Sequence, residues 1–417
     1  MILENKAGLT DAEMKEALQK SLEGKNLKKV LILPPDFTRM YSYAGRLTAM
    51  YYELLSPTCE VDIMPALGTH VPMTEEEWLA FFGEGVPFSK MIVHNWRTDV
   101  VKLGEVPASF VSEVSEGLVN NGIDVEVNKR LTDKSYDLII SIGQVVPHEV
   151  VGMANYSKNI FVGCGGSSMI NSSHMLGAFY GMERVMGRDF SPVRRVFDYA
   201  EENFLKDIPL LYVLTATTNK GDAVTVHGLY IGRERSNFEA AVKESQRVNL
   251  THVPARMEKV VVYLDPREFK STWLGNKAIY RTRMAMADGG ELIVLAPGVA
   301  HFGEDDENDR LIRKYGYVGR ENVLSLVADE KNADLKGNLS VAAHLIHGSS
   351  DGRFTIRYAT KHLTEEEVKA ANFAYAPYDE MAKKYDPQKL TDGWNDVDGE
   401  KIFYISNPAL GLWVADE

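Results

Sequence analysis

The chain has few of the features that mark extracellular, membrane or nucleic-acid-binding proteins. Its 417 residues include only two cysteines, Cys59 and Cys164, too few for a disulfide framework or a cysteine zinc site. No apolar run reaches the roughly 18 residues of a membrane-spanning helix, and the N-terminus lacks the pattern of a signal peptide. The formal net charge of -13 argues against nucleic acid and anionic membranes as partners. We therefore expect a cytoplasmic protein, and an enzyme is the plainest interpretation.

The sequence also lacks the fingerprint of a nicotinamide-dependent enzyme. Residues 163–168 read GCGGSS, and the third glycine of the pattern G-x-G-x-x-G is missing. A dehydrogenase of that kind is therefore disfavoured. The glycines could still bring backbone amides close to a phosphate group, so this loop remains a candidate for binding an anion.

Short apolar runs alternate with amphipathic segments along the chain, which is the pattern of α/β proteins. Residues 29–33 and 136–145 read as strands buried in a parallel sheet. Residues 61–65 and 159–163 read as further short strands of the same half. This half therefore predicts a parallel sheet with helices between its strands.

The pattern is interrupted at residues 252–254 and then begins again. A strand over residues 259–264 and a helix over residues 277–287 indicate a second, smaller α/β unit. We therefore predict two α/β domains, residues 1–255 and residues 256–417, with the active site in the cleft between them, a common location for ligand pockets.

Several helix starts are visible as capping patterns. Thr10 is followed three residues later by Glu13, which predicts a capping box, and Thr74 precedes an acidic first turn. The acidic run over residues 304–307 is expected to be a solvated helix start rather than a metal site.

Three chemically active side chains follow apparent strands of the first half. Arg39 comes after the first strand, His70 after the second and His148 after a later one. Residues at the carboxyl ends of such strands line the crevice where open α/β sheets bind ligands. Imidazoles are suited to acid/base chemistry near neutral pH, and an arginine can bind a carboxylate through two hydrogen bonds. Residue types alone thus point to an enzyme acting on a small anion.

The stretch from His148 to His174 carries a third candidate, Lys158. It lies ten residues after His148 and sixteen before His174. From the residue type alone, Lys158 could form a Schiff base, contact a phosphate or be a surface residue. The remaining histidines are interpreted as structural, including His344 and His347, which lack an evident third metal ligand nearby.

The motifs together resemble the nickel-pincer lactate racemase family. They are PPDFTR, GTHVPMTEEE, H-x-x-x-G-x-x-x-x-x-K and the histidine that follows. The resemblance covers most of the first half and continues more weakly into the second. Both intervals, 148 to 158 and 158 to 174, fit the family.

The resemblance implies a nickel-pincer nucleotide, a pyridinium mononucleotide with a thioamide and a thiocarboxylate. In the family it is attached covalently to a lysine, and a histidine completes a square-planar nickel site. By resemblance Lys158 is the attachment residue, His174 the nickel ligand, and Asp36 and Thr38 contact the cofactor. Two sulfurs with an imidazole suit Ni(II). Cofactor-maturation enzymes are the implied protein partners.

The resemblance also implies the roles around the substrate. His70 and His148 resemble the acid/base pair, and Arg39 the residue that orients the substrate carboxylate. Tyr280 and Arg281 resemble residues of a substrate-side helix in the second half. The implied reaction inverts C2 of a 2-hydroxy acid by proton-coupled hydride transfer.

Two departures from the family bear on the substrate and the cofactor. Residues 154–157 read ANYS where the family has Ser-Gly-Gly before the lysine, and Arg281 and Met284 stand where lactate racemases carry glutamine and lysine. We therefore expect an acid that is more polar or larger than lactate, such as an aldonate resembling gluconate. The alternative is a non-catalytic or cofactor-handling homologue that binds a small anionic ligand.

Overall fold

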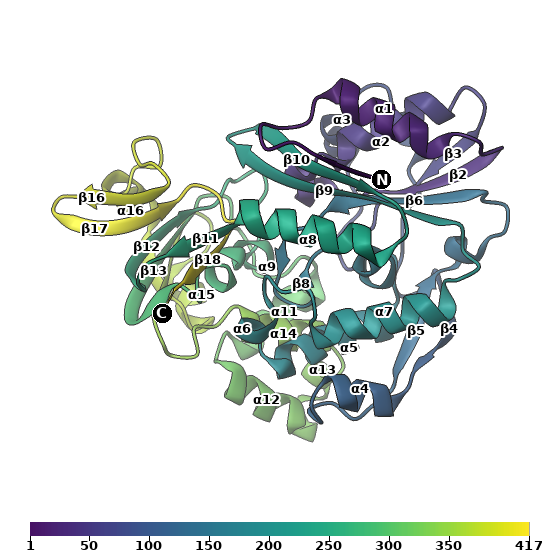
Figure 1. Ribbon diagram of the computed structural model, residues 1–417. Helices are drawn as coiled ribbons and strands as arrows, with labels where there is room; N and C mark the ends of the chain where they lie inside the picture. The colour runs from purple at the N-terminus through teal and green to yellow at the C-terminus, as the bar shows by residue number, and fades with distance from the viewer. Residues whose placement is uncertain (417) are drawn as a thin grey trace. The chain divides into compact units, whose positions relative to one another are not determined.

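The computed structural model describes residues 1–416, which divide into two compact units (Figure 1). The first unit comprises residues 1–180 and 184–249, and the second comprises residues 181–183 and the chain from Leu250 onward. Both are α/β, so the predicted fold class is confirmed. Across residues 1–416 no helix is both long and apolar enough to cross a membrane.

A six-stranded mixed sheet forms the frame of the first unit. Its strand order is β1-β10-β9-β6-β2-β3. β2 pairs in parallel with β3 and β6, and β6 pairs in parallel with β9, whereas β10 is antiparallel to both of its neighbours. The strands are β1 (Ile2–Glu4), β2 (Lys29–Leu33), β3 (Glu60–Ile63), β6 (Leu138–Gln144), β9 (Leu210–Lys220) and β10 (Ala223–Ile231).

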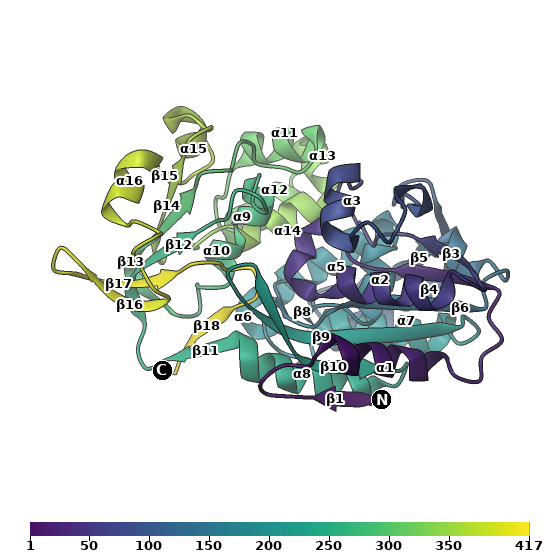
Figure 2. The same cartoon turned by 90° about the horizontal axis from the view of Figure 1, so that it is seen from above.

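Both faces of this sheet are covered, which explains the unbroken apolar runs in its central strands. Val30 and Ile32 of β2 face one core with α1 and α2, while Leu31 and Leu33 face the other with α5, α7 and α8. Figures 1 and 2 show the two helical layers. The helices of this unit are α1 (Asp11–Leu22), α2 (Ala44–Leu55), α3 (Glu75–Phe82), α5 (Ser167–Tyr180), α7 (Pro192–Phe204) and α8 (Arg235–Asn249), and α6 (Met182–Val185) has residues in both units.

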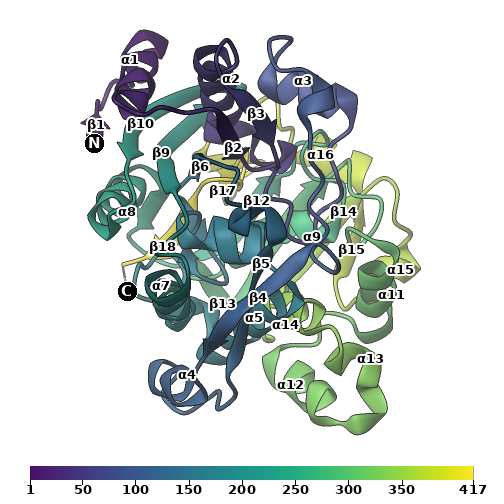
Figure 3. The ribbon, with the colours of Figure 1, turned by 90° about the vertical axis from the view of Figure 1, so that its right-hand side faces the viewer.

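The predicted helix starts are confirmed. Thr10 and Glu13 form a reciprocal capping box at α1, and Thr74 forms one with Glu77 at α3. A smaller hairpin, β4 (Val100–Val106) with β5 (Ile123–Asn128), packs against α5 and α7 and carries α4 (Ala108–Val114) (Figure 3).

Two predicted elements are wrong. Residues 159–163 form a π-helix, η4 (Asn159–Gly163), in which the Cys164 amide donates to the Asn159 carbonyl oxygen at 3.0 Å. The helix expected over 277–287 ends at Tyr280, because the chain from Met286 onward pairs with β12 of the second unit's sheet.

The second unit has its own six-stranded sheet, ordered β15-β14-β13-β12-β17-β16. All its pairings are parallel except that of β16 with β17, a hairpin drawn in yellow in Figure 1. α11 (Asp306–Tyr315) begins behind the N-cap Asp305, which confirms the acidic run as a helix start. The strands are β11 (Leu250–Val253), β12 (Met257–Tyr263), β13 (Met286–Ala296), β14 (Thr355–Thr360), β15 (Ala374–Pro377), β16 (Gly393–Val397), β17 (Glu400–Ile405) and β18 (Leu412–Ala415), and the other helices are α9 (Thr272–Gly275), α10 (Lys277–Tyr280), α12 (Arg320–Ala328), α13 (Ala333–Lys336), α14 (Leu339–His347), α15 (Glu365–Ala370) and α16 (Tyr378–Lys384).

Candidate active site

The carboxyl ends of three neighbouring strands deliver the predicted groups of the first unit. Asp36 follows β2, His70 follows β3, and His148 lies on β7 (Pro147–His148), a two-residue strand just after β6. Because β6, β2 and β3 are adjacent and parallel, their ends lie at one edge of the sheet. This is the edge at which open α/β sheets bind ligands.

Asp36 and His70 form a hydrogen-bonded pair. Asp36 is the N-cap of the short helix η1 (Phe37–Ser42), and its Oδ1 accepts bonds from the Thr38 amide at 3.0 Å and hydroxyl at 2.5 Å. Its Oδ2 lies 2.6 Å from His70 Nδ1. Burial alone would raise the pKa of Asp36, but the bonds from His70 and Thr38 and the charge of Arg39 hold it at about 2. An Nδ1–H donated to the carboxylate leaves His70 Nε2 as a proton acceptor.

The His70 loop is fixed to the π-helix. Gly68 adopts a left-handed φ of +57°, which glycine tolerates at no steric cost, and its amide donates to the Gly163 carbonyl oxygen at 2.9 Å. In turn the Asn159 side chain donates to Leu33 O of β2 and Ser141 Oγ of β6. The loop, the π-helix and the strands β2 and β6 therefore form one connected framework.

His148 sits in a different environment from His70. Burial lowers its pKa well below the usual range, and the nearby charges of Lys158 and Arg39 lower it further, while Glu149 opposes them. The Val150 amide donates to His148 Nδ1 at 3.1 Å. A neutral ring with Nδ1 as acceptor carries its proton on Nε2, so in this geometry His148 presents a hydrogen-bond donor.

Lys158 and Arg39 are neighbouring half-buried cations. Among residues 1–416 neither side chain makes a hydrogen bond or an ion pair, although each lies close enough to affect the charge of surrounding groups. Burial, aided by Arg39, lowers the pKa of Lys158 to about 8, against the opposing charge of Glu149. Half-buried cations without partners are costly, which marks this spot as a site for an anion or a reactive amine.

His174 lies in the middle of α5 with one ring nitrogen committed. Its Nδ1 donates to the Ile170 carbonyl oxygen at 2.6 Å, and burial lowers its pKa to about 4. The other nitrogen, Nε2, is then the one with a lone pair to offer. A histidine held in this way by a backbone carbonyl has the usual arrangement of a metal ligand.

The glycine-rich loop does not offer a phosphate cradle. The amides of Cys164 and Gly165 donate to carbonyl oxygens of the π-helix, and the Gly166 amide donates to the Glu126 carbonyl oxygen. At the start of α5 the Ser168 amide donates to the Glu126 carboxylate at 3.0 Å. The protein's own carboxylate thus takes the place that an anion would occupy at this helix start.

Tyr280 and Arg281 lie in the second unit, in α10 and directly after it. Both are buried, and Arg281 Nη1 donates to the Gly411 carbonyl oxygen at 2.8 Å. Their predicted contact with substrate stays a prediction.

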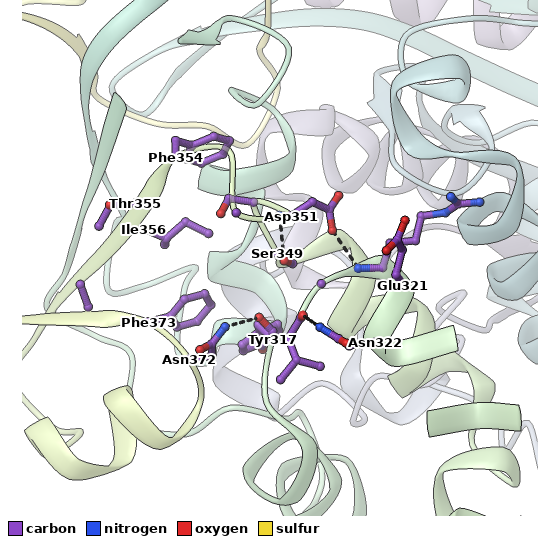
Figure 4. A pocket seen from close by; sticks show the side chains of 16 residues that line it. Tyr317, Glu321, Asn322, Ser349, Asp351, Phe354, Thr355, Ile356, Asn372 and Phe373 are labelled. Atoms are coloured by element: carbon purple, nitrogen blue, oxygen red, sulfur yellow. Dashed lines mark hydrogen bonds between the residues drawn. The ribbon is translucent and has the colours of Figure 1, made fainter. Parts of the chain in front are cut away.

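The second unit also holds a cavity of about 730 Å³ that contains none of the predicted site residues (Figure 4). Tyr317, Phe354 and Phe373 contribute to its wall. Asp351 lies at the same cavity, where its carboxylate accepts from the Arg320 amide at 2.8 Å and binds Arg283. The Asp351 carboxylate at this cavity is therefore already bound by groups of the protein.

Sequence reasoning missed two residues near the site. Glu149 contributes a carboxylate 3.5 Å from His148 Nδ1. Arg194 of α7 binds the loop that leads to Lys158, 36 residues away in the chain. Neither position carries a local motif, although the position of Glu149 directly after His148 is a usable signal.

The chain is similar to several known proteins. Residues 6–187 match the family described as lactate racemase N-terminal domain. A lactate racemase of Lactiplantibacillus plantarum is 28% identical over 123 residues, which span 29% of this chain and 26% of that protein. A Thermotoga maritima protein of known structure matches with a TM-score of 0.85 at 25% identity, over 99% of this chain and 100% of that one. The lactate racemase apoprotein of Thermoanaerobacterium thermosaccharolyticum shares the fold, with a TM-score of 0.67 at 17% identity over 96% and 92%.

Proposed function

Because residues 6–187 match the lactate racemase N-terminal domain, we propose that this chain is an isomerase that inverts C2 of a 2-hydroxy acid. The observation that carries the proposal is the pair Arg39 and Lys158, half-buried cations without partners among residues 1–416, beside His70 and His148. A carboxylate fits the charge of this spot, and an arginine binds it through two parallel bonds.

The residues present fit a nickel-pincer nucleotide attached at Lys158. The lysine amine has a pKa of about 8, so an appreciable fraction is neutral and nucleophilic near physiological pH. His174 offers Nε2 as a single protein ligand, which suffices where the cofactor brings its own sulfur and carbon ligands. When bound, the cofactor would supply the two-electron acceptor that no side chain can provide.

The chain's own residues would then orient the substrate and transfer its protons. Arg39 would hold the substrate carboxylate. His70, with Nδ1–H bound to Asp36, would take the hydroxyl proton on Nε2, and the carboxylate would stabilise the imidazolium that forms. His148 would donate from Nε2 to the oxygen at the other face of the same carbon, and an anionic substrate nearby would favour its protonated form.

The proposed substrate is an acid more polar or larger than lactate, such as an aldonate. This part of the proposal is supported by the resemblance to lactate racemases, in which Arg281 and Met284 stand where those enzymes carry glutamine and lysine. A panel of 2-hydroxy acids, each followed for loss of C2 stereochemistry by chiral chromatography, would identify the substrate. Rapid racemisation of lactate with no activity on the polar acids would contradict this part.

The central test is the covalent adduct. Protein produced together with the maturation enzymes should show an added mass that maps to Lys158 and is absent from Lys158→Ala. Lys206→Ala, an exposed lysine in the same unit, is the matched control and should keep the adduct. An adduct on another residue, or none despite active maturation enzymes, would contradict the assignment.

Nickel binding tests the role of His174. His174→Ala should retain the adduct on Lys158 but lose most of its nickel, because one of the four ligands is gone. Metal analysis of both proteins measures this directly. Full nickel occupancy in His174→Ala would remove His174 as the ligand.

The second candidate function is binding without turnover, either of a small anion or in cofactor handling. The charges of Arg39 and Lys158 favour it, because two cations without partners among residues 1–416 are sufficient to bind an anion even where no reaction follows. Adduct-bearing protein that binds the acids but never changes their C2 configuration would support this alternative.

A further inference from the structure

The loop that leads to Lys158 has an unfavourable backbone. Asn155 and Tyr156 are consecutive residues with left-handed φ angles of 63° and 58°. Residues with a Cβ rarely adopt this conformation, and tyrosine has no side-chain bond that compensates for it locally. Contacts from elsewhere in the unit must therefore hold the loop.

Arg194 supplies the most direct of these contacts. Its guanidinium donates three hydrogen bonds to the loop, from Nη1 to Ser157 Oγ at 2.7 Å and from Nη2 to the carbonyl oxygens of Met153 at 2.7 Å and Asn155 at 3.0 Å. The side chain is fully buried. It thus grips the loop on both sides of the left-handed residues.

Two further contacts make the loop dependent on its surroundings. Tyr156 stacks on Phe238 at a centroid distance of 4.9 Å, and its hydroxyl donates to the Arg233 carbonyl oxygen. The Asn155 side chain lies against Gly143 of β6, where a Cβ would come within 1.8 Å of Asn155 Nδ2. The loop therefore packs closely on the sheet and leaves little room for another path.

The side chain of Arg194 lies in an energetically unfavourable environment. Among residues 1–416 it forms no ion pair, and its buried Nε has no hydrogen-bond partner. Burying a guanidinium that no carboxylate bonds is unfavourable for stability, although the nearby charges of Asp198 and Asp189 offset part of this cost. An apolar residue would fill the space at a lower cost in free energy. The role of Arg194 therefore lies in the loop geometry that it imposes.

We propose that Arg194 is a positioning residue for Lys158. By holding Met153, Asn155 and Ser157, it fixes the direction in which the lysine side chain leaves the loop. The inference rests on the proposed function only for what Lys158 carries.

The first test uses protein made without the maturation enzymes. Hydrogen exchange of a peptide covering residues 153–159 reports the bonded amides of Ala154, Tyr156 and Asn159. Arg194→Met should exchange about tenfold faster or more, because it removes three bonds from a charged donor. Arg194→Lys, which keeps the charge but reaches fewer acceptors, should recover part of the protection.

The matched control is Arg235→Met. Arg235 lies over the same Phe238 ring at 5.0 Å and binds Asp189 and Asp198, but makes no hydrogen bond to the loop. It should lower global stability while leaving exchange of the loop near the wild-type rate. A milder variant, Ser157→Ala, removes one acceptor and should speed exchange about threefold.

The second test adds the maturation enzymes and measures the fraction of chains with an adduct on Lys158. This fraction should be at least tenfold lower in Arg194→Met than in wild type and intermediate in Arg194→Lys. It should stay near the wild-type value in Arg235→Met. The proposal is overturned if hydrogen exchange of the loop is unchanged in Arg194→Met, or if Arg194→Lys restores none of the protection. It is also overturned if Arg235→Met speeds exchange of the loop as much as Arg194→Met does. Wild type without an adduct would instead defeat the proposed function, and the exchange experiment would still decide the role of Arg194.

Discussion

The two sides of the candidate site differ in how burial affects the charge of their side chains. On the β3 side, Asp36 keeps its charge although it is buried, because His70 and Thr38 donate hydrogen bonds to it. On the other side, burial disfavours the charged forms of His148, Lys158 and His174. His70 is thus bonded to a charged carboxylate, whereas His148 lies among groups whose charged forms are disfavoured, so the two histidines cannot be equivalent in the resting protein.

This difference separates the contributions to stability from those to chemistry. The bonded side should stabilise the fold, whereas groups whose charged forms burial disfavours should cost stability and are retained for reactivity. Substitutions on the two sides should therefore act with opposite signs.

The largest expected effect is on catalysis by the two histidines. Replacing either with alanine should slow epimerisation by about 10² to 10⁴, the usual contribution of one acid/base group. Glutamine can donate a hydrogen bond but can neither take nor give up a proton near neutral pH. His148→Gln and His70→Gln should therefore stay as slow as the alanine variants, because each turnover moves a proton at both faces.

These rates are to be compared in preparations with equal adduct content. Single-turnover reactions with each pure epimer add a second criterion, because the two-face assignment requires the His70 and His148 variants to fail with opposite epimers. Recovery by glutamine at either position would show that the histidine there only donates a hydrogen bond, and equal losses with the same epimer would remove the two-face assignment.

The next effect is a gain in stability. Lys158→Met should raise the free energy of unfolding at pH 7 by about 1 to 3 kcal/mol, because burial lowers the lysine pKa from 10.5 to about 8 in the folded state. Below pH 8 the amine is charged in both states and the full cost applies. As the pH rises from 8 to 10.5 the folded state sheds its proton first, so the gain should shrink to zero.

Denaturant unfolding of protein without the adduct, at several pH values, measures this gain. Lys206→Met, a substitution of an exposed lysine, is the control and should change little. If Lys158→Met lowered the free energy of unfolding at pH 7, the side with Lys158 would contribute to stability in the same direction as the side with Asp36 and His70.

The smallest effect has the opposite sign. Asp36→Asn should lower the free energy of unfolding near pH 6 by about 1 to 2 kcal/mol, since Asp36 has its pKa lowered from 3.8 to about 2. A depressed carboxyl pKa stabilises the fold above the unfolded value, and this contribution is lost as the pH falls through 2. The difference between wild type and variant should therefore close between about pH 4 and pH 2.

Acid titration of both proteins by circular dichroism provides the measurement, with Asp207→Asn at an exposed position as control. A pH-independent difference would show that the substitution acts through packing rather than through the charge of Asp36.

The sequence predicted what local chemistry decides. The capping box at Thr10 and the buried strands β2 and β6 depend on spacing and apolar content within a few residues. Residues 159–163 were assigned wrongly because a short apolar run reads alike in a buried strand and a buried helix. What decides the case is tertiary: the Asn159 side chain bonds to β2 and β6, and no local pattern reports that.

The candidate site shows the same division. Strand-end positions allowed His70 and His148 to be chosen, and β2, β3 and β6 are indeed neighbours. The bond between His70 and Asp36, 34 residues apart, could not be predicted, and neither could the hold of Arg194 on its loop. Contacts of that kind depend on the packing of α7 and the strand-end loops.

The π-helix after Lys158 also has a consequence for how this chain can change over evolution. Each of its turns holds one residue more than an α-helical turn, so the segment acts as a built-in insertion. Deleting a single residue between 159 and 163 would restore ordinary pitch, yet it would rotate Lys158 by about 100° relative to His174. Relatives that use both residues should therefore tolerate almost any substitution in this segment more readily than a change in its length.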